Sequence, residues 1–334
     1  MRFQFILITC LTSIAAVHAL QAPTWPQLSS LVRRQGGSTC PSFWQTIGKD
    51  LQQSFLTTDK RECNDMARAA VRYAFHDAGT FSLKLPFAWP AAGGADGSLL
   101  LASSEIGRPA NGGLGPYHGF IGGKLGSYRS QFGNGVGAAD LIQFAASVAT
   151  VVCPGGPIVK TVVGRVDSTQ ASPANLLPPG FGQGSDHDSL LNLFSDKGFY
   201  AKDLAALIGA HSVATAFAQS GNGVPVNASL DSTPGKWDNN FYGETYNPPP
   251  GISRLQSDIN LSDPAKAVGQ EFRGFVGNPA KWALAFADAM HRLSVLGIPQ
   301  GISQGFADCT SALPGGTAST KRMRSAPLME RWVK

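Results

Sequence analysis

Residues 63–77 read CNDMARAAVRYAFHD and place Arg72 and His76 four positions apart. On a helix, side chains at this spacing share one face, so the guanidinium and the imidazole would lie together. Such a pair can act on a small polar substrate, because the imidazole moves a proton while the guanidinium stabilises developing negative charge. Taken alone, the pair is more typical of a solvated arginine beside a half-buried histidine, so its meaning depends on the rest of the chain.

Apolar residues recur at helical spacing in three further stretches, residues 141–152, 204–211 and 282–296. Alternating strand patterns are scarce and short. Stretches rich in glycine and proline, over residues 93–115, 167–184 and 221–251, predict long loops. The sequence therefore predicts a mostly α protein with long connecting loops, ending in a loosely ordered tail from Thr310 onward.

Composition narrows the class of protein. The chain has 334 residues, 43% of them hydrophobic and 15% charged, which fits one large or two modest domains and excludes a disordered chain. Lys and Arg number 27 against 22 Asp and Glu, a net charge of +5 without a long basic run. We therefore expect no nucleic acid as a partner. Beyond the N-terminus no stretch approaches the about 18 apolar residues of a membrane span, so we expect no membrane partner.

The N-terminus is typical of a secretory address. Residues 1–19 combine a basic start, a short apolar run and a small-residue exit, which predicts a signal peptide. Residues 20–34 end in two arginines and are interpreted as a propeptide, the alternative being an unprocessed basic tail. Removing both segments lowers the basic residues from 27 to 24 against 22 acidic ones. Sequons at Asn227 and Asn260 are consistent with a secreted, extracellular protein.

Four cysteines remain after the signal peptide, namely Cys40, Cys63, Cys153 and Cys309. In an oxidising compartment this number implies two disulfides, for which three pairings exist. A zinc site is the alternative, but the chain lacks the C-x₂₋₄-C spacing typical of one.

His211 lies on an apolar helical stripe with Leu204, Leu207 and Ile208. A lone histidine in this setting is by default a core residue. A metal-ligating imidazole usually donates its second ring N–H to a carboxylate, and Asp258 is a candidate for that partner downstream.

Taken together, Arg72-x-x-Phe75-His76-Asp77 and the later Gly-Ala-His211-Ser212 resemble the secreted fungal (class II) haem peroxidases of the plant-peroxidase superfamily, the group of lignin, manganese and versatile peroxidases. The resemblance extends over roughly residues 40–309. It implies a mostly α haem-peroxidase fold in which two helical domains sandwich one haem b. The distal domain would cover residues 35–163, the proximal domain residues 164–300, and a C-terminal extension residues 301–334.

The resemblance also implies roles for seven residues around the haem. His76 would be the distal acid–base group and Arg72 its catalytic partner. His211 would be the proximal iron ligand, with Asp258 as its carboxylate partner. The remaining residues would support the distal side: Phe75 as the distal aromatic, and Glu105 with Asn111 as the hydrogen-bond relay that orients His76.

Two oxygen-rich clusters match the calcium sites of the family, which implies two Ca²⁺ per chain. The distal ligands would be Asp77, the carbonyl of Gly94, Asp96 and Ser98. The proximal ligands would be Ser212, Asp231, Thr233, the carbonyl of Lys236 and Asp238. Oxygen ligands of this kind suit Ca²⁺, although turns use the same residue types. Because Asp77 adjoins His76 and Ser212 adjoins His211, we favour calcium.

The sequence departs from the ligninolytic members at defined positions. Asp65, Ala69 and Phe217 stand where three carboxylates would bind Mn²⁺, and Ala206 stands where a surface tryptophan would relay electrons. Leu230 replaces the aromatic that usually precedes the proximal calcium aspartate. Two disulfides replace the usual four, and the resemblance implies the pairs Cys63–Cys153 and Cys40–Cys309.

These features predict a secreted, monomeric haem peroxidase. It would use H₂O₂ to oxidise small phenolic or aromatic donors in one-electron steps through ferryl intermediates, with little activity on Mn²⁺ or bulky lignin. The alternative is a secreted haem- or calcium-binding protein without significant turnover. A zinc hydrolase lacks a suitable ligand motif, and the intracellular cytochrome c peroxidase-like enzymes lack the signal peptide and disulfides.

Overall fold

The fold is that of a computed structural model, which describes residues 39–86, 93–180, 182–216 and 223–315. The predicted signal peptide and propeptide, over residues 1–19 and 20–34, lie outside the described residues.

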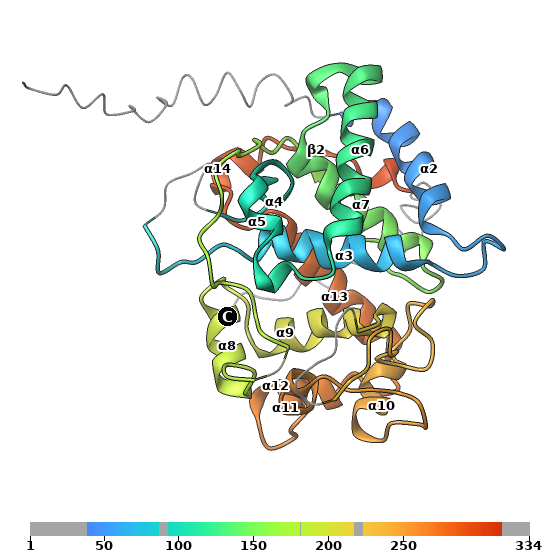
Figure 1. The fold of residues 1–334 in the computed structure, drawn as a ribbon, viewed down its shortest axis with the longest axis vertical. Helices are drawn as coiled ribbons and strands as arrows, with labels where there is room; N and C mark the ends of the chain where they lie inside the picture. The colour runs from blue at the N-terminus through green and yellow to red at the C-terminus, as the bar shows by residue number, and fades with distance from the viewer. Residues whose placement is uncertain (1–38, 87–92, 181, 217–222, 316–334) are drawn as a thin grey trace, which may run out of the picture.

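The described chain is mostly α-helical, as predicted (Figure 1). In chain order its helices are α2 (Phe43–Phe55), α3 (Asp65–Ala78), α4 (Ser98–Leu101), α5 (Ser103–Ile106), α6 (Gly115–Phe132), α7 (Ala138–Val152), α8 (His187–Ser195), α9 (Ala201–Ile208), α10 (Asn240–Tyr246), α11 (Gln256–Leu261), α12 (Ala267–Arg273), α13 (Pro279–Ser294) and α14 (Gln300–Ser303). The 3₁₀ turns are η1 (Pro109–Asn111), η2 (Gly133–Gly135), η3 (Gly209–Val213) and η4 (Thr310–Ala312), and the strands β1 (Val162–Val163) and β2 (Ala307–Asp308) pair antiparallel.

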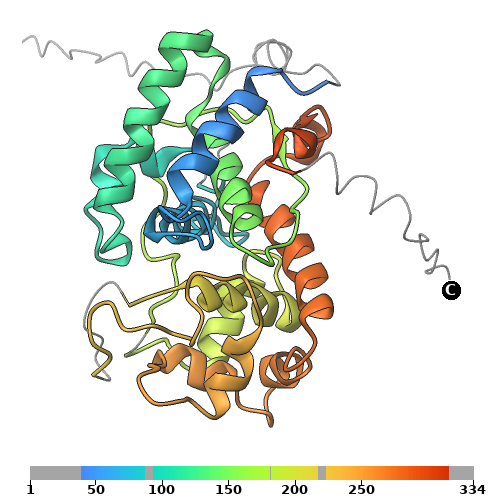
Figure 2. The same ribbon diagram turned by 90° about the vertical axis from the view of Figure 1, so that its right-hand side faces the viewer.

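The helices form two groups that face each other. In Figure 1 helices α2 to α7 lie in the upper half and α8 to α12 in the lower half. Helix α3 packs on α7 above, α9 packs on α12 below, and α13 contacts both α3 and α9. Figure 2 shows α13 running along one side of the molecule between the two groups. Helices α3 and α9, which lead to His76 and His211, therefore lie at the facing surfaces of the two groups.

Helix α3 is fixed at its start and along its buried face. Oδ1 of Asn64 accepts hydrogen bonds from the backbone N–H groups of Met66 and Ala67 at 3.0 and 3.2 Å, which satisfies two donors that a helix start leaves open. Its buried residues are mostly small, including Ala67, Ala70 and Ala74, and this allows close packing against α7. The last turn, which carries His76, is thereby held in a rigid part of the core.

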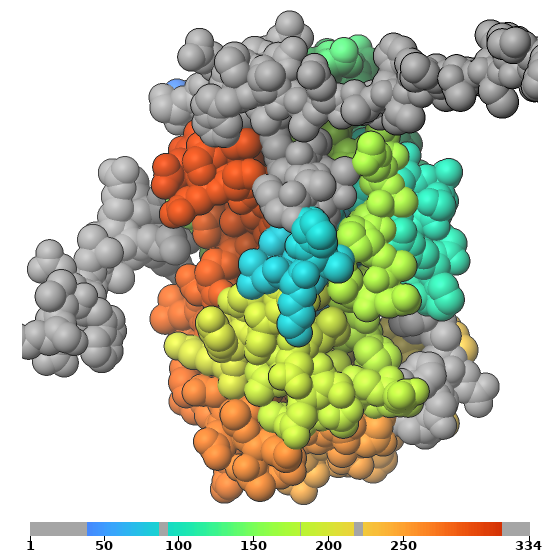
Figure 3. Space-filling model, turned by 90° about the vertical axis from the view of Figure 1, so that its left-hand side faces the viewer, coloured from blue at the N-terminus to red at the C-terminus, as the bar shows by residue number. Residues whose placement is uncertain are grey.

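A second contact between the halves follows α3 directly. Oγ of Ser82 donates to Oδ2 of Asp196 at 2.6 Å, and Nζ of Lys197 donates to the carbonyl of Phe81 at 3.0 Å. Figure 3 shows the segment after α3, in cyan, lying over the yellow-green surface of the other half. We call this contact, made by Phe81, Ser82, Asp196 and Lys197, the interlobe clamp.

Both disulfides join the pairs that the family resemblance implied, Cys40–Cys309 and Cys63–Cys153. The prediction of a loosely ordered tail from Thr310 onward is wrong for residues 310–313. Strand β2 pairs with β1, Cys309 is tied to Cys40, and Leu313 is 3% exposed. The local sequence contains no sign of these partners, because they lie about half a chain or more away.

Within the described ranges, no single helix is long and apolar enough to cross a membrane. Residues 115–135 and 138–152 meet the criteria of length and composition only as a pair bent by 117°.

Candidate active site

His76 lies in the last turn of α3 and is almost fully buried. Its Nδ1 is 2.8 Å from Oδ1 of Asn111, and Nδ2 of Asn111 donates to the carbonyl of Glu105 at 2.8 Å. Because that carbonyl fixes the amide orientation, Oδ1 of Asn111 faces the ring and accepts the Nδ1 proton. The lone pair of His76 then lies on Nε2, where it can accept a proton from a bound molecule.

Glu105 enters this relay through its backbone carbonyl. Its buried carboxylate accepts hydrogen bonds from the backbone N–H and, at 2.8 Å, the hydroxyl of Ser172. The carboxylate therefore anchors the loop around Ser172 to the segment that presents Asn111. Ser172 belongs to no recognisable sequence motif, so its hydrogen bonds to Glu105 could be found only from the structure.

Arg72 lies one turn before His76 on the same helix. Its guanidinium donates to the carbonyls of Gly112, at 2.9 Å, and of Ala110, at 3.3 Å. Burial lowers the pKa of Arg72 to about 10, so the group stays charged at neutral pH. Burial, and then the charge of Arg72, lower the pKa of His76 to about 3, which keeps the imidazole neutral. A neutral base and a fixed positive charge thus share one helix face, as the sequence predicted.

Phe75 packs between the two halves. Its ring lies edge-on to His76, with ring centroids 5.6 Å apart, and stacks on Phe194 of α8 at 5.8 Å. Phe75 therefore limits the ring of His76 on one side and contacts the opposite group of helices.

His211 lies in η3, directly after α9. Its Nδ1 is 3.1 Å from both carboxylate oxygens of Asp258, which is fully buried in α11. The side chain of His211 keeps 31% of its surface exposed. The carboxylate holds the Nδ1 proton, so the lone pair of the ring lies on Nε2, as in a metal-ligating imidazole. The structure thus joins the two residues that the sequence could only suggest as partners.

The predicted distal calcium residues lie together at the end of α3. Oδ1 and Oδ2 of Asp77 accept hydrogen bonds from the backbone N–H groups of Leu99 and Gly97, and Oδ1 of Asp96 accepts from that of Ser98. The carbonyl of Gly94 lies in the same turn, where it accepts from the N–H of Asp96 at 2.8 Å. Gly94 has a φ of +110°, and a Cβ there would collide with the carbonyl of Leu296, so only glycine fits this turn.

The predicted proximal calcium residues also converge. Oγ1 of Thr233 bonds to Asp238 at 2.7 Å and to Asp231 at 3.3 Å. Ser212 bonds to the carbonyl of Lys236 at 3.4 Å and accepts from the N–H of Asp238 at 3.3 Å. All five residues therefore line one small region next to His211.

Three oxygens in these clusters are buried without a hydrogen-bond partner in the described structure: Oδ2 of Asp96, Oγ of Ser98 and Oδ2 of Asp231. Burial raises the pKa of Asp96 and of Asp231 to about 7 and raises that of Asp77 as well. Buried carboxylates without a counter-charge are costly, and a hard cation with oxygen ligands would relieve that cost. No group of three or more His, Cys, Asp or Glu suited to a metal occurs among the described residues, so the clusters depend on hydroxyl and carbonyl oxygens as well.

Comparison with known proteins identifies the family. The family model described as "Peroxidase" matches residues 52–280. The chain belongs to the peroxidase family. It is 31% identical to a peroxidase of Coprinopsis cinerea, over 93% of this chain and 88% of the relative, and 31% identical to a peroxidase of Arthromyces ramosus, over 85% and 82%. It is 30% identical to versatile peroxidase VPS1 of Pleurotus eryngii, over 92% and 85%. The chain is accordingly a haem peroxidase, an oxidoreductase that oxidises substrates with H₂O₂.

The residues of this peroxidase fit a haem between the two histidines. Nε2 of His76 and Nε2 of His211 have no hydrogen-bond partner within the described ranges, whereas Nδ1 of each ring is fixed by Asn111 or Asp258. His76 lies in the last turn of α3 and His211 in the turn after α9, and these two helices lie at the facing surfaces of the two halves (Figure 1). The lone pair on Nε2 of His211 suits an iron ligand, and the lone pair on Nε2 of His76 suits a distal base.

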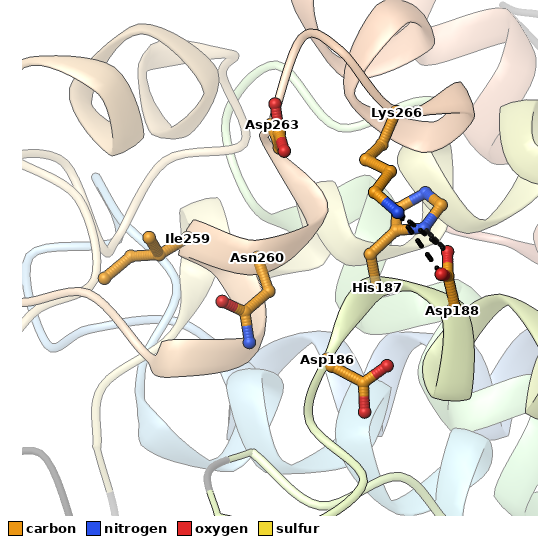
Figure 4. Close-up of a pocket in the computed structure, with 7 residues that line it drawn as sticks. All are labelled: Asp186, His187, Asp188, Ile259, Asn260, Asp263 and Lys266. Atoms are coloured by element: carbon orange, nitrogen blue, oxygen red, sulfur yellow. Dashed lines mark hydrogen bonds and ion pairs between the residues drawn. The ribbon is translucent and has the colours of Figure 1, made fainter.

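The other described histidines of the peroxidase have structural partners, as expected from their sequence context. Nδ1 of His118 bonds to the hydroxyl of Tyr73 at 2.8 Å, and Nδ1 of His291 to the carbonyl of Lys160 at 2.8 Å. His187 lines a pocket of about 380 Å³ (Figure 4), where Asp188 and the N–H of Val268 engage its two ring nitrogens. Each of these rings is thus held by a partner outside the His76–Asn111 and His211–Asp258 pairs.

The structure describes two of the three positions at which the resemblance implies a Mn²⁺ site, and also the position implied for a surface tryptophan. Asp65 is highly exposed and bonds to Arg68, with Oδ1 3.1 Å from Nε, while Ala69 is half-buried. Phe217, the third position, lies outside the described residues. Ala206 is fully buried, and its carbonyl accepts from Nε1 of Trp282 at 3.0 Å.

Proposed function

We propose that this chain is a secreted, monomeric peroxidase with one haem b and two Ca²⁺, and that its donors are small phenolic or aromatic molecules. His211 would bind the iron, with Asp258 giving its ring anionic character. When bound, the haem supplies the redox chemistry that reduces peroxide to water and oxidises donors one electron at a time.

His76 carries out the proton transfers in this proposal. Its Nε2 takes the proton from the inner oxygen of hydrogen peroxide and returns it to the outer oxygen, which leaves as water. Asn111 keeps the proton of the ring on Nδ1, so that Nε2 is free for both transfers. Arg72 stabilises the negative charge that develops on the departing oxygen. The observation that carries this proposal is the 2.8 Å hydrogen bond between His76 and Asn111.

The residues at the positions of the Mn²⁺ site and of the surface tryptophan support a restricted choice of donor. A divalent first-row ion needs several converging oxygen ligands, and Asp65 is already engaged by Arg68. With Ala206 buried, the chain offers no side chain at that position for a donor to contact. We therefore expect strong oxidation of phenols, negligible saturable oxidation of Mn²⁺ and weak oxidation of non-phenolic lignin models.

Steady-state turnover of the haem-loaded enzyme with H₂O₂ and one donor of each kind tests the proposal. His76→Ala should keep the haem but slow peroxide reduction by about 10²–10⁴-fold, the contribution of acid–base catalysis. His118→Ala, a half-buried histidine of the same half, serves as the control and should turn over like the wild type. Absence of phenol turnover in the wild type would support the alternative of a haem-binding protein without activity, whereas saturable Mn²⁺ turnover would refute the donor assignment.

A further inference from the structure

Trp237 and Trp282 form a stacked pair inside the proximal half. Their ring centroids are 5.8 Å apart with an interplanar angle of 5°, and the side chains are 2% and 1% exposed. Trp237 belongs to the loop before α10, and Trp282 to the first half of α13. We call these two residues the tryptophan pair.

The pair adjoins the turn that carries His211. A Cβ at Gly209, two residues before His211, would collide with Nε1 of Trp282 and with the hydroxyl of Tyr242. A series of ring contacts also leads from His211 to the pair: His211 to Phe241 at 5.7 Å, Phe241 to Tyr242 at 5.5 Å, and Tyr242 to Trp282 at 5.7 Å. Easily oxidised side chains thus lie within a few ring contacts of the proposed iron ligand.

We propose that the tryptophan pair is an internal redox site, which gives one electron to the oxidised haem when peroxide is present and donor is scarce. The inference rests on the proposed function, because His211 must hold the haem. Reduction of H₂O₂ to water leaves two oxidising equivalents on the enzyme. One of them is then neutralised by an electron from the indole, which becomes a radical cation and keeps its Nε1 proton.

The hydrogen bonds decide which ring holds the missing electron. Oxidation of Tyr242 requires loss of its phenolic proton, but its hydroxyl donates to the carbonyl of Ala205 at 2.7 Å, and a carbonyl is not a base. An indole needs no such loss. Nε1 of Trp282 donates to the carbonyl of Ala206 at 3.0 Å, which stabilises positive charge on the ring, and stacking on Trp237 spreads that charge.

The burial of the tryptophan pair explains why the radical would stay in the interior of the protein. Both indoles are buried. At the position where the resemblance implies a surface tryptophan, the chain has Ala206, which is also buried. The pair therefore stores one oxidising equivalent until a small donor reduces the haem, and does not deliver it to a bulky substrate at the surface.

Freeze-quench electron paramagnetic resonance of the holoenzyme, mixed with one equivalent of H₂O₂ without donor, tests the inference. The wild type should give a tryptophan cation-radical signal, and ring-deuterated tryptophan should change its hyperfine pattern. Trp282→Phe should lose most of the signal, and Trp237→Phe should change its hyperfine structure because the charge can no longer spread. Trp44→Phe is the matched control, since Trp44 is equally buried but packs on Phe43 and Phe144 in the other half.

Phenol turnover separates the failure of this inference from the failure of the proposed function. Wild-type enzyme that oxidises phenols but forms no tryptophan radical overturns the inference alone, as does a signal that persists in both Trp282→Phe and Trp237→Phe. A signal in the wild type that Trp44→Phe abolishes also overturns it. Wild-type enzyme without phenol turnover overturns both. Mapping of hydroxylated tryptophan by mass spectrometry after excess peroxide gives a second readout, expected at Trp282 and Trp237.

Discussion

The side chain of Asn111 determines which nitrogen of His76 can act as a base. Replacing it by valine, which has a similar shape but no acceptor, would allow the His76 ring to turn or to move its proton to Nε2. We expect Asn111→Val to lose part of the about 10²–10⁴-fold supplied by acid–base catalysis while binding haem normally. The rate of peroxide reduction in stopped-flow experiments measures this effect, and a wild-type rate would contradict the role of Asn111.

The same residues show how far sequence reasoning reaches at this scale. Arg72 and His76 could be placed on one helix face from their spacing, because helix geometry fixes that relation. His211 and Asp258 are 47 positions apart in the sequence, and only the fold shows that they are in contact. The role of Ser172 could not be predicted at all, since a serine that binds a buried carboxylate looks like any other loop serine.

At the scale of elements, the two oxygen-rich clusters connect loops to the turns that carry His76 and His211. Removal of calcium should leave the carboxylates of Asp96 and Asp231 buried without a counter-charge. We therefore expect chelation to lower the thermal stability of the holoenzyme and to change its haem spectrum. A site occupied at about 100 times its Kd contributes about 2.7 kcal/mol, so the loss should be readily measurable by calorimetry.

A matched pair of variants separates this effect from general loss of charge. Asp96→Asn should reduce the additional destabilisation caused by chelation, because one ligand charge is already missing. Asp65→Asn, at a highly exposed position, should respond to chelation like the wild type. Elemental analysis that finds no calcium in fully active enzyme would refute the structural role of the ion.

The helices themselves were predictable where they are long and amphipathic. Helices α3, α7 and α13 coincide with stretches of helical spacing in the sequence, whereas α9 ends at Ile208 and the predicted stripe over residues 204–211 continues into the 3₁₀ turn η3, which carries His211. Shorter elements escaped: α10 lies within residues 221–251, where only a loop was predicted, and it has seven residues. A helix of two turns contains too few apolar repeats to define a face, and its formation depends on tertiary packing.

At the scale of the whole molecule, the Cys40–Cys309 disulfide joins the beginning of the described chain to its last segment. It closes a loop of 269 residues, and such long loops restrict the unfolded chain most. Cys40→Ser with Cys309→Ser should therefore destabilise the enzyme by about 5–6 kcal/mol in the chain-entropy description. Denaturant unfolding measures the loss, and since neither cysteine lies among the proposed active-site residues, phenol turnover below the unfolding midpoint should stay at the wild-type level.

The interlobe clamp makes the cohesion of the two halves depend on pH. Burial lowers the pKa of Lys197 from 10.5 to about 8 in the folded enzyme. Between these two values the unfolded chain binds more protons than the folded one, so this residue makes the free energy of unfolding rise with pH through that window. Below pH 8 the buried ammonium reduces stability by the full amount, on the order of a few kcal/mol.

Lys197→Met removes the buried charge and should flatten this rise. The measurable quantity is the difference in free energy of unfolding between variant and wild type, followed by denaturant titration from neutral pH to pH 10.5. Below pH 8 the difference should favour the variant most, since the lost hydrogen bond to Phe81 is worth only about 1 kcal/mol, and at the alkaline end it should shrink or reverse. Lys49→Met, at an exposed site on α2, is the control and should keep the wild-type slope. Parallel curves for Lys197→Met and the wild type would show that the ammonium of Lys197 is as well solvated in the fold as in the unfolded chain, and that the clamp is held by Ser82 and Asp196 alone.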